Sequence, residues 1–560
     1  MIGAEALLKI LESWGVNYFF GCPGTTEVAI LDALVNRQRP KFILCTHEAV
    51  AVSAADGYAR VTGGPGLVTL HANVGLGNGI SYIHNAYMAN VPLVAINLIK
   101  SRSILGHRAF TVAHDHQEMV KQYTKWDWQV LTSKMLVEDL ERALRLAITP
   151  PIGPTYLAIP QDILEAEVGR FNIEGPPKGQ WFYQPSSRDI GRAADILAKA
   201  RFPLIISGAG VAQEDVIEQM VKLAKGLSSA VCCEHRLNLD YNPYPTEEDH
   251  FVGPFHPEAE LVKYADVILA IGCKLFVEFQ PSKKPWIPPR TKLIHLNSDA
   301  NEIGNLYRVE VGLCSSVKEG VDELLTALSP RLIGRERMLT KRNQKVRSLH
   351  ETFLRRRKDY FEATKDCRSL KVGTLIQELA GIVNQNTTLV LDAVTSNDAL
   401  VEYVPRHNTK SYYASATGAS LGWGMGAALG VKIGDPKREV ICVIGDGAFM
   451  FGAPALHTAE KCHVPVCFII INNSSYAAVK AGLLRYKGQA AQKGVFPGTD
   501  IGGPDYATIA KGFGVPGFKV ISKRDLVRLP KVIGKERGPV LVEVVTDPAD
   551  EGGLGIEIIS

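Results

Sequence analysis

Two short polar segments, each following a run of apolar residues, contain side chains that are able to bind a metal ion. Gly445-Asp446-Gly447 follows the apolar run 440–444, and Asn472-Asn473 follows the apolar run 466–471. Runs that are apolar throughout are typical of parallel strands covered on both faces. The carboxyl ends of such strands lie side by side, at the edge where open α/β sheets bind ligands.

The residue types in these two segments favour Mg²⁺ and a diphosphate. The Asp446 carboxylate, the Asn473 amide oxygen and a backbone carbonyl near Ser475 would form, with two diphosphate oxygens, the hard oxygen cage that Mg²⁺ prefers. The glycines beside Asp446 let backbone N–H groups approach the diphosphate closely. The alternative is that both strands end in ordinary Gly and Asn turns.

This pattern, in a chain of 560 residues, resembles that of the thiamine diphosphate (ThDP) enzymes of the benzoylformate decarboxylase and acetolactate synthase type. The resemblance implies that ThDP and Mg²⁺ are the cofactors, with the metal bound by Asp446, Asn473 and Ser475. It also implies cofactor contacts along both segments, at Gly445, Asp446, Gly447, Ala448, Asn473, Ser475 and Tyr476.

A segment near the amino terminus contains a glutamate that matches a second family motif. Residues 42–45 predict a strand, and Thr46-His47-Glu48 leads from it into a helix of small residues. The resemblance places the cofactor-activating glutamate at Glu48. Its carboxyl group would share a proton with N1′ of the aminopyrimidine and so favour loss of the proton at C2. A second role, compatible with the first, is that Glu48 complements the dipole of its helix.

Two further positions in the same block match residues that act on the substrate. His71 ends the strand pattern 68–71, where acetolactate synthases usually show Thr-Ser-Gly-Pro-Gly and benzoylformate decarboxylase has a proton-transferring histidine. Thr25 matches a substrate-binding serine of that decarboxylase, and its hydroxyl is able to hold a carboxylate. His71 therefore favours a 2-oxo acid decarboxylase. The alternative is a hydrogen-bonded structural histidine at a strand end.

The resemblance also assigns a turn that bends the cofactor into a V shape. Leu421 matches the apolar residue between the two rings, and the carbonyl of Ala419 matches the acceptor for the 4′-amino group, where many relatives have glycine. Thr395 and Ser396, after the strand pattern 388–391, match another diphosphate-binding turn. The alternative for all four is a tight turn that packs the start of a helix.

The sequence departs from both subfamilies. The decarboxylase has a second catalytic histidine in its middle domain, whereas the comparable segment 275–280 has none, and Glu278 or Gln280 would have to substitute. Residues 116–118 only partly match the Phe-Gln-Glu signature of acetolactate synthases. Residues 207–211 resemble a dinucleotide-binding turn, but short glycine turns after strands are common, so FAD is not expected.

The elements that position these residues form three α/β blocks. We expect a pyrimidine-binding domain over 1–168, a central domain over 188–330 and a diphosphate-binding domain over 370–560, each a mostly parallel sheet flanked by helices. Apolar runs predict further strands at 66–70, 92–97, 155–159, 203–207, 230–233, 267–271, 292–296 and 540–545. The basic segment 330–368 is interpreted as a solvated linking helix, and alternatively as a patch for an anionic ligand.

Composition sets further limits. The net charge of +4 is too small over this length to indicate nucleic acid, and the ten cysteines show neither a disulfide framework nor CxxC spacing. No signal peptide and no apolar run of membrane-spanning length is evident, so we expect a cytoplasmic protein without membrane contact. The resemblance implies a homodimer at minimum and a homotetramer as the assembly, with ThDP bridging two subunits.

The sequence therefore predicts ThDP- and Mg²⁺-dependent decarboxylation of a 2-oxo acid by a lyase that also has some carboligation activity. An acetolactate-synthase-like carboligase, or another enzyme that cleaves or transfers C–C bonds, is the alternative within the family. Two other classes stay open. One is a Rossmann-type oxidoreductase that uses the turn 208–210, which lacks a full GxGxxG, and the other is a ThDP-binding protein with little catalysis.

Overall fold

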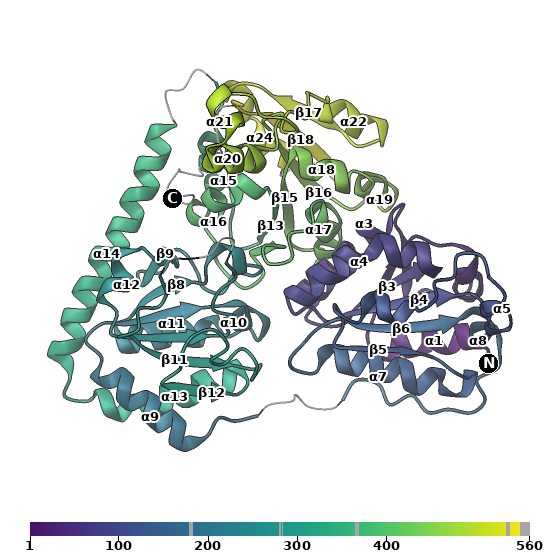
Figure 1. Ribbon diagram of the computed structural model, residues 1–560, viewed down its shortest axis with the longest axis horizontal. Coiled ribbons are helices and arrows are strands. Elements are labelled where there is room, and N and C mark those ends of the chain that lie inside the picture. The colour runs from purple at the N-terminus through teal and green to yellow at the C-terminus, as the bar shows by residue number, and fades with distance from the viewer. Residues whose placement is uncertain (178–182, 279–281, 283, 365–368, 534–537, 549–560) are drawn as a thin grey trace.

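Three parallel six-stranded sheets, each flanked by helices, make up the protein (Figure 1). The structure is a computed structural model that describes residues 1–560 except 178–182, 279–281, 283, 365–368, 534–537 and 549–560. The three sheets lie within the three segments predicted from the sequence, and the predicted α/β fold class is confirmed.

The first sheet has the strand order β2-β1-β3-β4-β6-β5. Its strands are β1 (Tyr18–Gly21), β2 (Lys41–Leu44), β3 (Gly66–His71), β4 (Leu93–Ile99), β5 (Trp126–Gln129) and β6 (Thr155–Pro160). Its helices are α1 (Gly3–Ser13), α2 (Val28–Ala33), α3 (Glu48–Thr62), α4 (Ala72–Met88), α5 (Arg102–Leu105), α6 (His116–Val120), α7 (Leu136–Ile148) and α8 (Gln161–Glu165). The core on one face is built with α1 and α7, and the core on the other face with α3 and α4.

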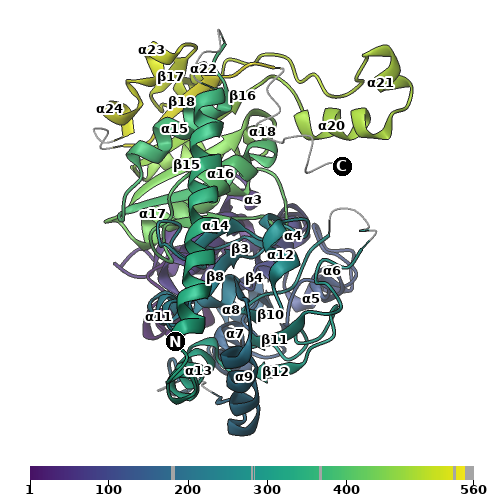
Figure 2. The same cartoon turned by 90° about the vertical axis from the view of Figure 1, so that its left-hand side faces the viewer.

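The third sheet repeats this topology, with the order β14-β13-β15-β16-β18-β17. Its strands are β13 (Thr387–Asp392), β14 (Tyr412–Ala414), β15 (Glu439–Gly445), β16 (Val466–Asn472), β17 (Gly517–Val520) and β18 (Val540–Val545). Its helices are α15 (Val372–Ile382), α16 (Asn397–Tyr403), α17 (Trp423–Gly434), α18 (Asp446–Gly452), α19 (Ala455–Lys461), α20 (Ala477–Tyr486), α21 (Gln489–Lys493), α22 (Tyr506–Gly512), α23 (Lys523–Leu526) and α24 (Leu529–Ile533). Helices α20 and α21 extend away from the rest of this domain (Figure 2).

The second sheet has the order β12-β11-β10-β7-β8-β9. Its strands are β7 (Pro203–Ser207), β8 (Ala230–Cys233), β9 (Phe251–Pro254), β10 (Val267–Ile271), β11 (Lys292–Asn297) and β12 (Val311–Cys314). Its helices are α9 (Ser187–Lys199), α10 (Ala209–Gln213), α11 (Ile217–Leu227), α12 (Glu260–Tyr264) and α13 (Val317–Leu332). The basic linking segment forms the long helix α14 (Glu336–Ala363), which runs from the second domain towards the third (Figure 1).

The first and third domains pack tightly through α3 and α17. A Cβ atom at Gly430 would lie 1.9 Å from the carbonyl oxygen of Ala54, and one at Gly57 would lie 2.2 Å from that of Ala427. Only glycine fits at both positions, so the two helix backbones are able to approach closely. Among the helices of the described ranges, none combines the length and the apolar character needed to cross a membrane.

Candidate active site

The predicted diphosphate-binding residues lie at the point where the strand order of the third sheet reverses. The chain places β14 on one side of β13 and β15 on the other, so the crevice between the carboxyl ends of β13 and β15 is a topological switch point. Open α/β sheets bind ligands at such points. Thr395 and Ser396 follow β13 in a short 3-10 helix, and Asp446 follows β15 at the start of α18.

The Asp446 carboxylate connects the ends of β15 and β16. Its Oδ2 accepts the backbone N–H groups of Asn473 at 3.0 Å and Ser474 at 2.7 Å, and its Oδ1 accepts that of Gly447 at 2.7 Å. Burial raises the pKa of Asp446, and these N–H groups offset part of that rise. The Asn473 amide oxygen accepts the N–H of Ser475 at 3.0 Å. Both side chains keep lone pairs for a cation, because a carboxylate or amide oxygen accepts more than one bond.

The surrounding loop fits a diphosphate and a hard cation. A Cβ atom at Gly447 would lie 2.4 Å from the ring of Tyr476, so this position requires glycine. The Ala448 side chain is buried in the core, which leaves its backbone as the group that a ligand is able to contact. Within the described ranges, no group of three or more His, Cys, Asp or Glu residues is placed to hold a metal alone. A metal at Asp446 would therefore need amide, carbonyl and ligand oxygens, the donor set that suits Mg²⁺.

A cavity of about 330 Å³ lies beside this loop and is lined by the turn predicted to shape the cofactor. Ala419 and Leu421 line it, as does Thr395 from the neighbouring turn. Ala419 has φ +55°, the left-handed region that favours glycine, which accounts physically for the glycine expected there in relatives. The Leu421 carbonyl accepts the Tyr82 hydroxyl at 2.8 Å.

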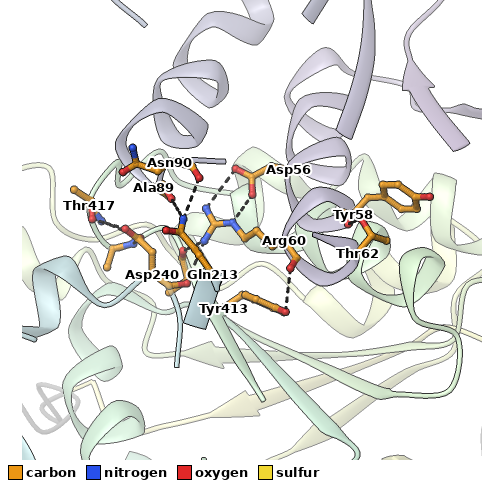
Figure 3. Close-up of polar contacts among 12 residues, drawn as sticks. Asp56, Tyr58, Arg60, Thr62, Ala89, Asn90, Gln213, Asp240, Tyr413 and Thr417 are labelled. Atoms are coloured by element: carbon orange, nitrogen blue, oxygen red, sulfur yellow. Dashed lines mark hydrogen bonds and ion pairs between the residues drawn. The ribbon is translucent and has the colours of Figure 1, made fainter. Parts of the chain in front are cut away.

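The residues of this turn are held by a buried network that joins all three domains (Figure 3). Arg60 of α3 pairs with Asp56 and donates to the backbone carbonyls of Asp240 at 3.1 Å and Ala414 at 2.8 Å. The Asp240 carboxylate accepts the N–H of Ala416 at 2.7 Å and the hydroxyl of Thr417. The turn that carries Ala419 and Leu421 is therefore positioned by charged groups from both other domains.

His71 lies at the corresponding switch point of the first sheet, between β1 and β3. Its Nδ1 is 3.0 Å from Oε2 of the buried Glu27 and 2.7 Å from the Thr26 hydroxyl. That hydroxyl donates to the same Glu27 oxygen at 2.8 Å. Both neighbours therefore act as acceptors for Nδ1, which places the ring proton there and leaves Nε2 to accept or deliver a proton.

Glu48 is the first residue of α3, so its carboxylate complements the dipole of that helix, the second role expected for it. Its Oε2 accepts the Asn78 side-chain N–H at 3.1 Å. Burial, and then the charges of Glu48 and Glu27, raise the pKa of the Cys22 thiol, which places the three side chains in one electrostatic neighbourhood. Thr25 is exposed and its hydroxyl accepts Lys100 Nζ at 3.1 Å.

The sequence-predicted residues form two separate groups within one chain. Thr395, Ala419 and Leu421 line the cavity of the third domain, beside the Asp446 loop. The lining described for this cavity does not include Glu48, His71 or Thr25, which lie at the carboxyl edge of the first sheet. The two groups of predicted residues therefore do not line this cavity together.

The second sheet adds to the same cavity and does not show an open dinucleotide turn. Glu278 and Arg236 line the cavity, whereas Gln280 lies outside the described residues. At this sheet's own switch point, a Cβ atom at Gly208 would lie 2.4 Å from the carbonyl oxygen of Gly272, so the glycine turn serves close packing. The carboxylate of Glu214 already accepts the first N–H groups of α13.

Several residues near the site were not found by sequence reasoning. They are Thr26, Glu27, Lys100, Asp240, Asp392 and Arg485. Glu27 lies two residues after Thr25 and was recognisable as a nearby carboxylate. The other five residues make contacts with positions far apart in the chain, and no local sequence pattern predicts such contacts.

Comparison with protein families finds matches in all three domains. The description “Thiamine pyrophosphate enzyme, N-terminal TPP binding domain” applies to residues 1–121, the corresponding central domain to 190–324, and the C-terminal TPP binding domain to 392–544.

Curated and solved relatives span nearly the whole chain. A probable acetolactate synthase large subunit of Methanocaldococcus jannaschii is 27% identical, covering 98% of this chain and 93% of its own. The benzoylformate decarboxylase of Pseudomonas aeruginosa is 28% identical, covering 97% and 98%. Among solved structures, a ThDP-dependent 4-hydroxybenzoylformate decarboxylase of Rhodococcus jostii is 25% identical, with a TM-score of 0.82 over 98% of this chain and 99% of its own.

Proposed function

Because the chain belongs to the thiamine pyrophosphate enzyme family, we propose that it is a ThDP- and Mg²⁺-dependent enzyme that decarboxylates a 2-oxo acid and releases an aldehyde. The observation that supports decarboxylation is the His71–Glu27 pair, with Nδ1 3.0 Å from the carboxylate. Two relatives whose names specify a benzoylformate or 4-hydroxybenzoylformate decarboxylase agree with this choice.

Each group of residues has a distinct task in this proposal. Asp446, Asn473 and a carbonyl near Ser475 hold Mg²⁺ and the diphosphate, and Leu421 and the Ala419 carbonyl set the shape of the cofactor. Bound ThDP supplies the site that accepts the electron pair left when CO₂ departs. Glu48 holds a proton at the aminopyrimidine. Thr25 binds the substrate carboxylate, and His71 delivers a proton from Nε2 to the reacting carbon.

Carboligation is the second candidate activity. A carboligase must keep the reacting carbon unprotonated until a second carbonyl arrives, whereas a decarboxylase must protonate it. Within the described part of segment 275–280, no histidine accompanies His71, which favours incomplete protonation and some ligation. The acetolactate synthase relative agrees with this alternative.

A panel of 2-oxo acids with ThDP and Mg²⁺, with and without added aldehyde, tests the proposal. We expect CO₂ and aldehyde from aromatic or branched 2-oxo acids. His71→Ala should retain ThDP and lose aldehyde release by roughly 10²- to 10⁴-fold, the usual effect of a lost general acid or base. Remaining turnover should shift towards ligation.

His84→Ala serves as the matched control, because His84 packs on Tyr123 and lies outside the His71 contacts. Aldehyde release at the wild-type rate from His71→Ala would make His71 structural and favour the carboligase. A wild type that binds ThDP but neither turns over the panel nor exchanges the C2 proton would instead be a binding protein with little catalysis.

A further inference from the structure

An ammonium group lies next to the predicted substrate-binding hydroxyl. Lys100 follows β4 directly, and its Nζ donates to the Thr25 hydroxyl at 3.1 Å. Strand β4 neighbours β3, and β3 ends at His71. Lys100 and Thr25 therefore stand at the same carboxyl edge of the first sheet as His71, although they are 75 residues apart in the chain.

The charge of Lys100 is not neutralised by a neighbour. In the part of the chain that the structure describes, its one polar contact is the neutral Thr25 hydroxyl, and it forms no ion pair. The next cation in the sequence is different, because the Arg102 guanidinium is bound by Asp162, with Nε 2.8 Å from Oδ2. Lys100 is half-buried and Thr25 is exposed, so a ligand is able to reach both.

The direction of this hydrogen bond leaves two donors for a ligand. An ammonium group has three N–H donors and no acceptor, so Lys100 donates to Thr25 and keeps further N–H groups. The Thr25 oxygen accepts that bond, which leaves the hydroxyl proton for another acceptor. A carboxylate has two acceptor oxygens, and charge-assisted bonds to it are stronger than neutral ones.

We propose that Lys100 and Thr25 together form the subsite for the carboxylate of the 2-oxo acid and that Lys100 determines the preference for acids over aldehydes. This inference rests on the proposed function. The subsite is separate from the diphosphate loop of the third sheet, so it serves the substrate and not the cofactor. His71, on the adjacent strand, is then beside the carbon that loses the carboxylate.

Substitution of Lys100 should affect the reaction of a 2-oxo acid but not that of an aldehyde as the donor substrate. Lys100→Met should raise KM for the best 2-oxo acid of the panel about 10- to 100-fold, the range of a lost hydrogen bond to a charged group. The kinetics of ligation between two aldehyde molecules should stay within about twofold of wild type, because an aldehyde lacks the carboxylate. Lys100→Arg should restore most of the loss, since it keeps the charge.

Binding provides a readout that does not require turnover. Calorimetry with mandelate or lactate, the 2-hydroxy acids with aromatic and small side chains, should show weaker binding to Lys100→Met than to wild type, with no difference for mandelamide or lactamide. ThDP content should be unchanged. Lys121→Met is the matched control, because Lys121 already pairs with Glu118 at 2.7 Å.

The outcomes distinguish this inference from the proposed function. Equal KM values and equal mandelate and lactate binding for wild type and Lys100→Met would overturn the carboxylate subsite while leaving decarboxylation intact. A proportional loss with acid and aldehyde would also overturn it, because it would make Lys100 structural. Absence of 2-oxo acid turnover by wild type would overturn the proposed function, and the binding measurement would still decide the role of Lys100.

Discussion

At the scale of single residues, we expect cofactor binding to depend most on Asp446. Its carboxylate accepts the N–H groups of the consecutive residues Asn473 and Ser474 and of Gly447, so it fixes the loop in which the metal site is predicted. Burial raises its pKa, and a bound cation would favour the charged form and reverse that effect. Loss of this carboxylate therefore removes both a ligand and the support of the loop.

Asp446→Ala should abolish retention of ThDP and Mg²⁺ through purification, and EDTA should release ThDP from wild type in the same way. Cofactor content by fluorescence and metal content by mass spectrometry measure both effects. Asp505→Ala is the control, since that exposed carboxylate caps α22 through the Thr508 N–H at 2.8 Å and its removal affects only the end of that helix. Wild-type cofactor content in Asp446→Ala would refute the assignment.

At the scale of secondary-structure elements, a buried carboxyl group joins the end of β13 to the start of α17. Asp392 Oδ2 accepts the N–H of Gly424 at 3.1 Å. Burial raises the pKa of Asp392 to about 7, although backbone N–H groups from α17 and the residue before it lower it in part. The same side chain lines the predicted cofactor cavity, so its protonation state affects both stability and the charge beside the ligand.

Asp392→Asn should make the cofactor-free protein more stable than wild type at pH 8, on the order of 2 kcal/mol, and much less so at pH 5. In wild type the folded protein holds this proton up to a pH of about 7, whereas the unfolded chain loses it near 3.8. The proton therefore favours folding at low pH, and that contribution is lost as pH rises towards 7. Denaturant unfolding of both proteins from pH 5 to 8 measures this contribution to the free energy of unfolding. A difference between the two proteins that stays constant over this pH range would contradict the prediction.

At the scale of the whole molecule, the residues predicted to act on the pyrimidine and the substrate do not line the cavity of the third domain. Glu48, His71 and Thr25 lie at the carboxyl edge of the first sheet, while the cavity beside the Asp446 loop is lined by residues of the second and third domains. We therefore propose at least a homodimer, in which each site takes its pyrimidine half from one subunit and its diphosphate half from the other, and a homotetramer as the full assembly.

Mixing two inactive variants tests this arrangement. Glu48→Gln and Asp446→Ala should each have little activity alone, whereas co-expression of differently tagged chains should recover about a quarter of wild-type specific activity. In a mixed dimer, one site contains both substitutions and the other contains neither. Random pairing makes about half of the dimers mixed, so about a quarter of all sites are unaltered. Activity no higher than that of the single variants would show that each site forms within one chain.

The sequence by itself determined most of the central strands and the residues at their ends. Strands such as β15, β16 and β18 are buried along their length, so their apolar runs are continuous and identify them locally. The turns after these strands contain Asp446 and Asn473, and a parallel sheet brings such ends together without further information. The three α/β blocks were predicted from the same kind of local signal, whereas Glu48 and His71 were proposed from the resemblance to family motifs.

The tertiary structure alone decided most of the edge strands and the partners of the site residues. Strands β5, β9, β12, β14 and β17, each at the edge of its sheet, were not predicted, and neither was β1, which lies inside the first sheet. An edge strand has a neighbour on one side only, so mixed patterns such as that of β17, with one buried residue in four, are tolerated. Thr26 and Glu27 reach His71, and Lys100 reaches Thr25, because strands β1, β3 and β4 end at the same edge of the sheet. Such contacts join residues dozens of positions apart, which is why periodicity and spacing did not identify them.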